Sequence, residues 1–253
     1  MISRRAARRW GACLAALVVG AVAAMGADGP GPAKIVEEDA TFKSRGQEVV
    51  VDICAPEAPG KHPAVVVLHG HGGVGEGKRS GSHDLARRLA RAGYVALVPH
   101  YFGSRKPDPK DGRKNVRSFA AWERTVGETV SYASRRADVD PKRIGLLGTS
   151  MGSWVALSVA ARDRRVSAVV EYYGGFPVWE ALDPSQLPPV LVLHGDADRN
   201  VKVDEAHRLE QILQQAGVVH EVHIYPGAGH GFRGDHAEDA MRRTLEFFGA
   251  HMK

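Results

Sequence analysis

The sequence predicts a single α/β domain with a mostly parallel central sheet, an N-terminal antiparallel hairpin and helices on both faces. Two observations indicate this class. Runs such as 64–68 and 190–193 are apolar at every position, which is typical of strands that helices cover on both faces. These runs alternate with longer stretches of helical periodicity. A length of 253 residues suffices for one such domain, and no internal repeat or second domain is evident.

The elements follow in order along the chain. Predicted strands at 35–42 and 47–55 are joined by a turn at 44–46, which indicates an antiparallel hairpin. The later predicted strands are 64–68, 94–98, 144–147, 166–170, 190–193 and 219–225. The predicted helices are 82–92, 116–136, 152–161, 203–216 and 236–249. We expect Asp140-Pro141 to end the long helix before the strand at 144–147.

The N-terminus resembles an export signal. Residues 1–26 contain four arginines and no acid, and the arginines are followed by an apolar run at 12–25 with small residues at 21, 23, 24 and 26. This run is short for a membrane span, which needs about 20 apolar residues. We therefore expect a signal peptide at 1–26, a Gly/Pro linker at 27–33 and the folded domain at 34–253. An uncleaved anchor or a wrong start codon is the alternative.

Composition limits the partners. The formal net charge is +5, but removing the predicted signal leaves 30 basic and 29 acidic residues, so no nucleic-acid partner is implied. We expect an exported protein, periplasmic or secreted, that has no stable membrane insertion after signal cleavage. We also expect a monomer or a small homo-oligomer. Cys54 would be the one remaining cysteine, which excludes an intramolecular disulfide and is most simply explained as a half-buried strand residue.

The central motif is G-T-S-M-G at residues 148–152, between the apolar residues 144–147 and the apolar-rich run 154–161. This is the G-x-S-x-G pattern of a nucleophile elbow, a sharp strand-to-helix turn that exposes a serine hydroxyl. Glycine is needed at both outer positions because a Cβ would clash where strand and helix backbones pass closely. The pentapeptide also arises by chance, but its position between a strand and a helix indicates an elbow with Ser150 as nucleophile.

A serine nucleophile needs a base that takes its proton and an acid that orients the base. In enzymes with this elbow the acid and then the histidine follow the serine along the chain. Asp196 and Asp198 come directly after the next-to-last strand, and His230 lies in the Gly-rich segment 227–232 after the last strand. The carboxyl ends of parallel strands meet at one edge of a sheet, so these side chains are expected to meet there.

An oxyanion hole needs two N–H donors. One is expected from the backbone of Met151, directly after the nucleophile. The second is expected from His71, because the segment H-G-H-G-G at 69–73 resembles the HGGG-type turn that supplies such a donor. The imidazole of His71 faces either the substrate or the solvent.

A metal site is the competing interpretation of the histidines. His69, His71 and His194 all follow strands, but their spacing matches no metal-ligand motif. His194 is better explained as a hydrogen-bonding residue that stabilises the loop after its strand. We therefore expect no metal and no cofactor.

At these residues the sequence resembles the dienelactone hydrolase family of the α/β-hydrolases. The resemblance covers most of residues 35–251 and is carried by the segments 98–103, 143–152, 194–198 and 225–232. It implies an α/β-hydrolase fold and hydrolysis of carboxylic esters or lactones. It also implies a catalytic triad in which the acid falls on Asp198 and the base on His230.

Two departures from the family pattern favour a serine esterase of the same superfamily. The founding members use a cysteine where Ser150 stands, and they carry a glutamate where Gly70 stands. The same motifs also resemble the catalytic domain of acylaminoacyl- and prolyl-type serine peptidases, which is the main alternative. A non-catalytic hydrolase-like binding protein is less favoured, because such proteins usually lack a triad residue. The expected partner is a small-molecule ester or lactone.

Candidate substrate contacts lie at the same edge of the predicted sheet. They are Tyr101, Phe102, Arg105 and Arg233. The loop 103–114 is rich in basic residues, and with Arg233 it could hold a substrate carboxylate, as the resemblance implies. A solvated basic loop is the commoner explanation for such a segment.

Overall fold

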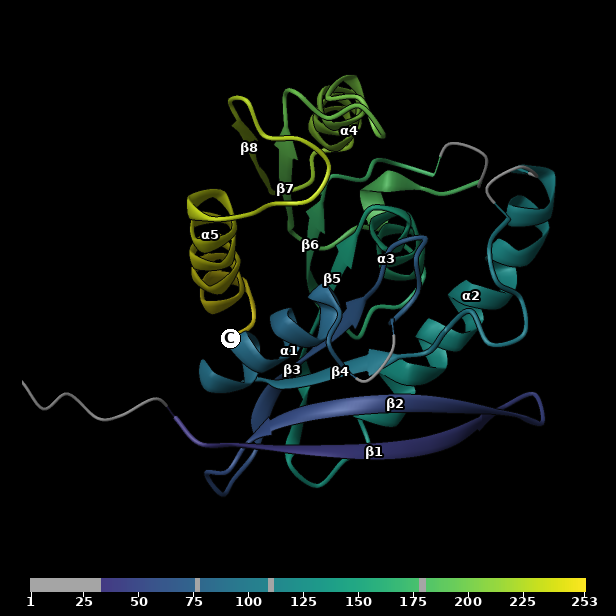
Figure 1. The fold of residues 1–253 in the computed structure, drawn as a ribbon, viewed down its shortest axis with the longest axis vertical. Coiled ribbons are helices and arrows are strands. Elements are labelled where there is room, and N and C mark those ends of the chain that lie inside the picture. The colour runs from purple at the N-terminus through teal and green to yellow at the C-terminus, as the bar shows by residue number, and fades with distance from the viewer. Residues whose placement is uncertain (1–32, 76–77, 109–111, 178–180) are drawn as a thin grey trace, which may run out of the picture. The chain divides into compact units, whose positions relative to one another are not determined.

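The structure, a computed structural model, describes residues 33–75, 78–108, 112–177 and 181–253 (Figure 1). The predicted signal peptide at 1–26 and all but the last residue of the predicted linker therefore lie outside the described residues. In the described part of the chain, no helix is long and apolar enough to cross a membrane.

An eight-stranded sheet forms the centre of the fold, in the order β1-β2-β4-β3-β5-β6-β7-β8. β1 and β2 form the predicted antiparallel hairpin, β2 pairs antiparallel with β4, and all later pairs are parallel. The strands are β1 (Ile35–Ser44), β2 (Gln47–Pro56), β3 (His62–Leu68), β4 (Val95–Pro99), β5 (Val139–Thr149), β6 (Val166–Tyr172), β7 (Val190–Gly195) and β8 (His220–Tyr225). The mostly parallel sheet with an N-terminal hairpin is confirmed.

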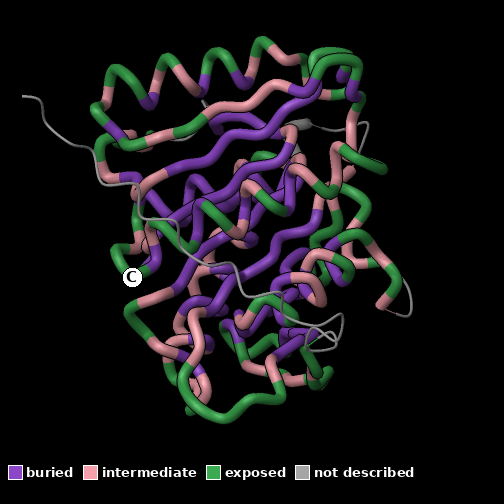
Figure 2. The backbone as a smooth tube through the Cα atoms, turned by 90° about the vertical axis from the view of Figure 1, so that its left-hand side faces the viewer, coloured by how far each residue is buried: buried purple, intermediate pink, exposed green. Residues whose placement is uncertain are grey.

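Helices cover both faces of the sheet, as predicted (Figure 1). One apolar cluster contains residues of α2 (Gly112–Ala133), α3 (Met151–Ala160) and α4 (Asp204–Gln215), and the other contains residues of α1 (Gly81–Arg91) and α5 (Asp235–His251). A short 3₁₀ helix, η1 (Pro184–Gln186), precedes β7. The strands between the two clusters are the most buried part of the backbone (Figure 2).

The apolar runs form the buried strands for the expected reason. Residues 64–68 of β3 have no exposed surface, because their side chains alternate between the two apolar clusters. On α1, Ala86, Leu89 and Ala90 are fully buried at the i, i+3, i+4 spacing of a helix face. Burial on both faces excludes polar side chains from such strands, so the few that occur there need a specific partner.

Two details differ from the sequence prediction. The long helix α2 ends at Ala133, and Asp140-Pro141 lies in the first residues of β5 instead of ending the helix. Proline is tolerated there because the ladder between β3 and β5 shifts register before Ile144, so its missing N–H removes no central bond. Cys54 is fully buried, because α1 covers its face of β2.

β1 is an edge strand and carries three consecutive acidic residues. Each forms an ion pair with a basic residue of a neighbouring segment. The pairs are Glu37–Arg87, Glu38–Arg136 and Asp39–Lys78. The outer edge of the sheet is therefore highly charged.

Candidate active site

Ser150 is the one residue between β5 and α3, and its backbone is strained. Its φ is 52° and its ψ is −120°, a conformation that a non-glycine residue rarely adopts. A Cβ on Gly148 would lie 2.5 Å from the backbone of Ser153, and one on Gly152 would lie 2.4 Å from the carbonyl oxygen of Leu68. The predicted requirement for glycine at both positions is confirmed, and the motif folds as a strand-to-helix elbow.

The structure brings Ser150, His230 and Asp198 together. His230 Nε2 lies 3.0 Å from Ser150 Oγ, and His230 Nδ1 lies 2.7 Å from Asp198 Oδ2. The Nδ1–H group donates to the carboxylate, so the unprotonated Nε2 of a neutral ring accepts the hydrogen bond from the serine hydroxyl. The three residues follow β5, β7 and β8, so the carboxyl ends of these parallel strands bring them to the same edge of the sheet.

Asp198 is held firmly in its loop. Its Oδ1 accepts hydrogen bonds from the backbone N–H groups of Asn200 (2.8 Å) and Val201 (3.0 Å), and its side chain is fully buried. Burial alone would raise the pKa of the carboxyl, but the hydrogen bonds from His230 and the two backbone groups lower it below its ordinary value. Asp198 is therefore an ionised, oriented acceptor for His230.

Asp196 occupies the position expected of a loop-bracing residue. Its exposed side chain accepts a hydrogen bond from the backbone N–H of Gly227 at 2.7 Å, which ties the loop after β7 to the loop after β8. The two loops also touch at Gly195, where a Cβ would lie 2.2 Å from the carbonyl oxygen of Ala228. Among the described residues, the hydrogen bonds of His230 go to Asp198 and Ser150, and none joins it to Asp196.

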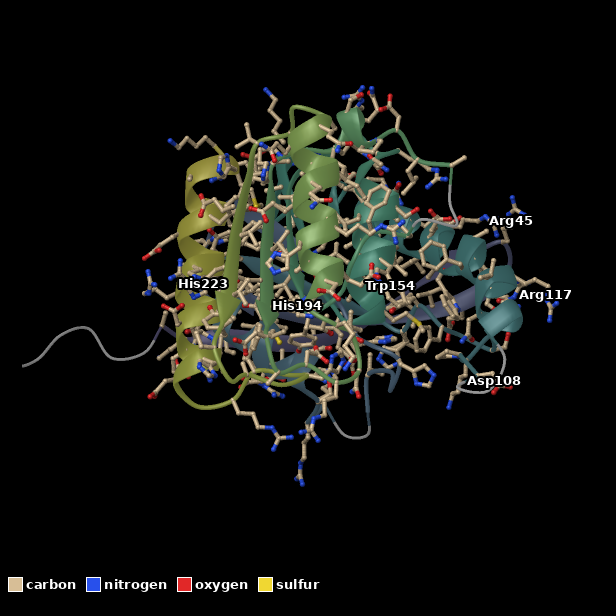
Figure 3. All side chains as sticks on the ribbon, turned by 90° about the horizontal axis from the view of Figure 1, so that it is seen from above. Arg45, Asp108, Arg117, Trp154, His194 and His223 are labelled. Carbon is tan, nitrogen blue, oxygen red and sulfur yellow. The ribbon has the colours of Figure 1, made fainter. Side chains whose placement is uncertain are left out.

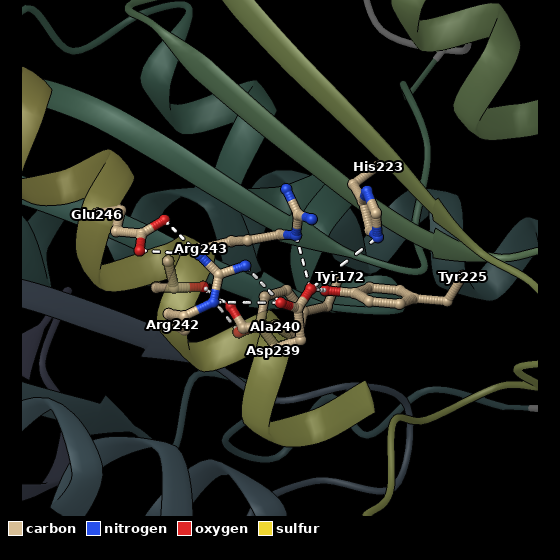
Figure 4. Close-up of polar contacts among 9 residues, drawn as sticks. Tyr172, His223, Tyr225, Asp239, Ala240, Arg242, Arg243 and Glu246 are labelled. Carbon is tan, nitrogen blue, oxygen red and sulfur yellow. Dashed lines mark hydrogen bonds and ion pairs between the residues drawn. The ribbon is translucent and has the colours of Figure 1, made fainter. Parts of the chain in front are cut away.

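The loop that carries His230 is anchored on both sides. Gly227 and Gly231 have φ values of 74° and 93°, which glycine adopts without strain. At the end of β8, the hydroxyl of Tyr225 donates to Asp239 of α5 at 2.9 Å, and the basic residues that follow Asp239 on α5 also pair with it (Figure 4). On the other side, the ring of Tyr173 packs edge-on against His230 at 4.9 Å.

His194 stabilises the acid loop, as the sequence suggested. It has no exposed surface and lies on β7 in the interior of the molecule (Figure 3). Its Nε2 donates to the carbonyl oxygen of Val201 at 2.9 Å, and burial lowers the pKa of the ring. His69, part of the alternative metal site, donates from Nδ1 to the carbonyl oxygen of Gly70 at 2.9 Å. Among the described residues, no group of three or more histidine, cysteine, aspartate or glutamate side chains is arranged so that it could hold a metal ion.

The loop after β3 lies against the elbow. A Cβ on Gly70 would lie 3.2 Å from Ser150 Cβ and 3.3 Å from the carbonyl oxygen of Thr149, so a larger residue would crowd the nucleophile. His71 follows directly and is exposed. The loop turns sharply, with the N–H of Gly73 donating to the carbonyl oxygen of Gly70 at 3.1 Å. The backbone near His71 is therefore close to the nucleophile.

Tyr101 has a different role from the predicted substrate contact. It is 2 % exposed, its hydroxyl donates to the carbonyl oxygen of His69 at 2.6 Å, and its ring stacks on that histidine at 4.2 Å. Burial lowers the pKa of His69 to about 4, so this ring is neutral at pH 7. Tyr101 therefore supports the loop after β3 and leaves little surface for a substrate.

The other three candidate contacts are placed less centrally. Phe102 is mostly buried but lines a cavity beside the loop after β3. Arg105 has an exposed side chain, and its carbonyl oxygen accepts a hydrogen bond from Trp122 Nε1 at 3.0 Å. The side chain of Arg233 is exposed three residues after His230. The structure brings neither arginine into the hydrogen-bonded chain of Ser150, His230 and Asp198.

Glu171 is a residue beside the site that the sequence pattern did not single out. This residue of β6 is fully buried beside the elbow, pairs in register with Gly148, and accepts a hydrogen bond from the N–H of Gly174 at 2.8 Å. Burial raises the pKa of its carboxyl to about 7, although Gly174 and Ser153 donate to it. The sequence signal that could have identified Glu171 is a single acid directly after the apolar strand run 166–170.

A serine elbow after the fifth strand of such a sheet is the arrangement of the α/β-hydrolase fold, and the chain has this fold. Comparisons with known proteins narrow this class further. A model of the dienelactone hydrolase family matches residues 50–252, so the chain belongs to that family.

Individual relatives agree with this membership. A Yersinia pestis protein named "Putative carboxymethylenebutenolidase" is 30% identical over 244 residues, covering 84% of this chain and 88% of the relative. A Bradyrhizobium protein named "Probable 2-oxo-3-(5-oxofuran-2-ylidene)propanoate lactonase" is 27% identical, covering 79% and 84%. A crystal structure from Klebsiella pneumoniae, described as a "Putative Dienelactone Hydrolase", has a TM-score of 0.73 and 25% identity, covering 86% of this chain and all of that one.

Proposed function

We propose that the protein hydrolyses carboxylic esters or lactones through an acyl-enzyme on Ser150. The observation that carries this proposal is the hydrogen-bonded chain from Ser150 through His230 to Asp198, built on a strained elbow. Family membership supports the ester or lactone class, since the names of two relatives given above describe such activities.

Each residue has a defined task in the proposed reaction. His230 takes the proton of Ser150 as the hydroxyl oxygen attacks the ester carbonyl, and later delivers that proton to the leaving alcohol. Asp198 keeps the proton of His230 on Nδ1, so that Nε2 faces the serine. Water then attacks the acyl-enzyme, with His230 again acting as the base.

The negative oxygen of the tetrahedral intermediate needs two donors. We assign them to the backbone N–H groups of Met151 and His71. Met151 begins α3, so its N–H belongs to the helix N-terminus, where backbone donors and the helix dipole favour a negative charge. The close approach of Gly70 to Ser150 supports the assignment of His71, the next residue along the loop.

A fluorophosphonate probe tests the nucleophile directly. The probe should label Ser150 and no other residue, as mapped by mass spectrometry of the digested protein, and the label should be absent in Ser150→Ala. Cys54 should remain unlabelled, because it is buried and burial raises the pKa of its thiol to about 11. Labelling of Cys54, or of another serine, would contradict the assignment.

A second test concerns the chemistry of the reaction. Hydrolysis of p-nitrophenyl esters and of lactones should exceed hydrolysis of matched peptide amides, and incubation with EDTA should leave the rate unchanged. Preferred cleavage of the peptide amides would favour the peptidase alternative. Loss of activity with EDTA that a divalent metal ion restores would contradict a mechanism that depends on these side chains alone.

We also propose that the protein is exported. The arginine cluster followed by an apolar run within residues 1–26 supports this. Fractionation of a cell that expresses the full chain should place the protein outside the cytoplasm, with a new N-terminus near residue 24 or 27. A full-length cytoplasmic protein would contradict the proposal.

A further inference from the structure

A second polar cluster consists of Asp52, His83 and His100, and it adjoins a cavity that the loop after β3 also lines. Asp52, on β2, is 5 % exposed, and one of its oxygens, Oδ2, accepts hydrogen bonds from two histidines. His83 Nε2 of α1 and His100 Nε2, just after β4, each lie 2.8 Å from this oxygen. The backbone N–H of His100 also donates to Val50 of β2 at 2.9 Å. His100 is therefore fixed both by its main chain and by its ring.

The carboxylate determines where the ring protons are. Burial alone would raise the pKa of the Asp52 carboxyl, but the hydrogen bonds from His100 and His83 lower it to about 2, so Asp52 is ionised at neutral pH. An ionised carboxylate only accepts, so both histidines carry a proton on Nε2. His83 Nδ1 lies 2.9 Å from Ser80 Oγ and accepts its hydroxyl proton. In a neutral ring, His100 Nδ1 is the remaining imidazole acceptor of this cluster.

His100 lines a cavity of about 600 Å³, and its side chain is 37 % exposed. His71, Gly72 and Gly73 line the same cavity, and Gly70, directly before them, is close to Ser150, since a Cβ on it would lie 3.2 Å from Ser150 Cβ. The cavity therefore begins about one residue, or about 3.8 Å along the chain, from the glycine that lies beside Ser150.

The lining of this cavity suits a neutral substrate with one polar end. Its apolar side chains are Val50, Val74, Phe102 and Pro107. Among the described lining residues, Lys106 is the one lysine or arginine and Glu48 is the one carboxylate. Because the charge of Asp52 lies directly behind His100, a carboxylate placed on this ring would be repelled, whereas a hydroxyl group can donate to Nδ1.

We propose that His100 is a specificity-determining residue whose Nδ1 accepts a hydrogen bond from a substrate hydroxyl. The hydroxyl is carried at the end of an apolar acyl or alcohol part that occupies the cavity. Asp52 is the positioning residue, since its carboxylate holds the proton of His100 on Nε2. This inference rests on the proposed esterase function and adds to it the class of ester that the site selects.

Matched ester pairs test the selection in the wild-type protein. Methyl 3-(4-hydroxyphenyl)propanoate is compared with its unsubstituted and 4-methoxy analogues, and 4-hydroxyphenethyl acetate with phenethyl acetate. The hydroxyl is remote from the ester in each pair, so the intrinsic reactivity is the same. One hydrogen bond to a partly exposed acceptor should raise kcat/KM for the hydroxyl ester of at least one pair by about ten-fold.

Variants then assign the preference to His100. Gln can reproduce the Nε2 donor of histidine but has no acceptor at Nδ1, so His100→Gln should keep the bond to Asp52 and lose the hydroxyl preference. His100→Asn places an acceptor near the Nδ1 position and should retain part of the preference. His207→Gln, on the exposed face of α4, is the matched control and should behave as wild type.

The role of Asp52 has a spectroscopic signature. The ¹⁵N spectrum of wild type should show His100 protonated on Nε2, and Asp52→Asn should populate the other tautomer while the hydroxyl preference falls. A purely structural role for Asp52 would lower the melting temperature without changing the tautomer.

The outcomes separate this inference from the proposed function. Equal kcat/KM values within both wild-type pairs, or a better substrate when a carboxylate replaces the hydroxyl, would overturn the inference. A hydroxyl preference that persists in His100→Gln would also overturn it. Failure of the proposed function would appear differently, as full turnover of p-nitrophenyl acetate by Ser150→Ala.

Discussion

In the described part of the molecule, two hydrogen-bonded chains join a serine, a histidine and an aspartate, and we propose a catalytic role for only one of them. In the first, Ser150 Oγ lies 3.0 Å from His230, which lies 2.7 Å from Asp198. In the second, Ser80 Oγ lies 2.9 Å from His83, which lies 2.8 Å from Asp52. By residue type and distance alone the two chains cannot be told apart.

The surroundings of the serine make the difference. Ser150 has a strained φ of 52°, whereas Ser80 has a relaxed φ of −77° at the start of α1. His230 lies on a loop with 22 % of its side chain exposed, while His83 is buried in a helix and is three residues from its serine. The comparison teaches that strain at the serine and access to the histidine separate the proposed triad from a buried chain with similar hydrogen-bond distances.

Replacing each serine gives the sharpest test of this comparison. Ser150→Ala should lower kcat on a p-nitrophenyl ester by about 10⁴-fold or more, because the nucleophile is lost. Ser80→Ala should lower kcat by less than about ten-fold, and cost about 1 kcal/mol of stability for the lost hydrogen bond to His83. Steady-state kinetics and thermal denaturation measure both. Comparable losses of kcat in the two variants would remove the distinction.

The two aspartates of the loop after β7 give the next largest contrast. Asp198→Asn should lower kcat by up to about 10⁴-fold, because His230 then adopts the wrong tautomer, with little change in melting temperature. Asp196→Asn should cost about 1 kcal/mol of stability through the weakened bond to Gly227, and should still turn over. If the two phenotypes are exchanged, Asp196 is the triad acid.

The sequence predicted the Ser150–His230–Asp198 chain and missed the Ser80–His83–Asp52 chain for a physical reason. Ser150, His230 and the aspartates each follow a strand of a parallel sheet, so strand order alone brings them to one edge. Asp52 and His83 come from a strand and a helix that no local pattern relates. The available signal was a single acid in the apolar run 49–55, since a buried carboxylate needs a partner.

The sequence also predicts where a residue lies in the sheet better than it predicts where the side chain points. The motif at 98–103 placed Tyr101 at the correct edge, but the sequence did not show that its ring turns inward onto His69. The elements were predicted with errors mainly at their ends, because hydrophobic periodicity fixes the middle of an element better than its last turn.

Two buried carboxyls, Glu171 beside Ser150 and Asp52 in the Ser80 chain, should make the stability of the protein change in opposite directions with pH. Burial raises the pKa of Glu171 from 4.5 to about 7, so the folded protein keeps this proton longer than the unfolded chain does. The retained proton contributes fully to the free energy of unfolding below about pH 4.5. This contribution is lost as pH rises to about 7, a change of up to about 3 kcal/mol. Glu171→Gln should abolish this fall in melting temperature, measured between pH 4.5 and 8. An identical fall in the variant would contradict it.

Asp52 should show the smaller and opposite effect. Its pKa is lowered from 3.8 to about 2, so its ionised form stabilises the folded protein above about pH 4, and this contribution is lost as pH falls toward 2. Asp52→Asn should therefore cost about 1 to 2 kcal/mol at pH 7, and the difference from wild type should vanish near pH 2. Urea denaturation at several pH values measures this. A difference that is constant with pH would instead indicate lost packing.

The row of acids on β1 also governs how copies of the molecule meet in solution. An edge strand offers unpaired backbone groups to a second chain, and a strand that paired here would have to accommodate the ion pairs that the three acids form with Arg87, Arg136 and Lys78. These charged side chains therefore disfavour edge-to-edge association, most strongly at low ionic strength. In concentrated salt, light scattering from the folded protein should increase before any loss of its circular dichroism.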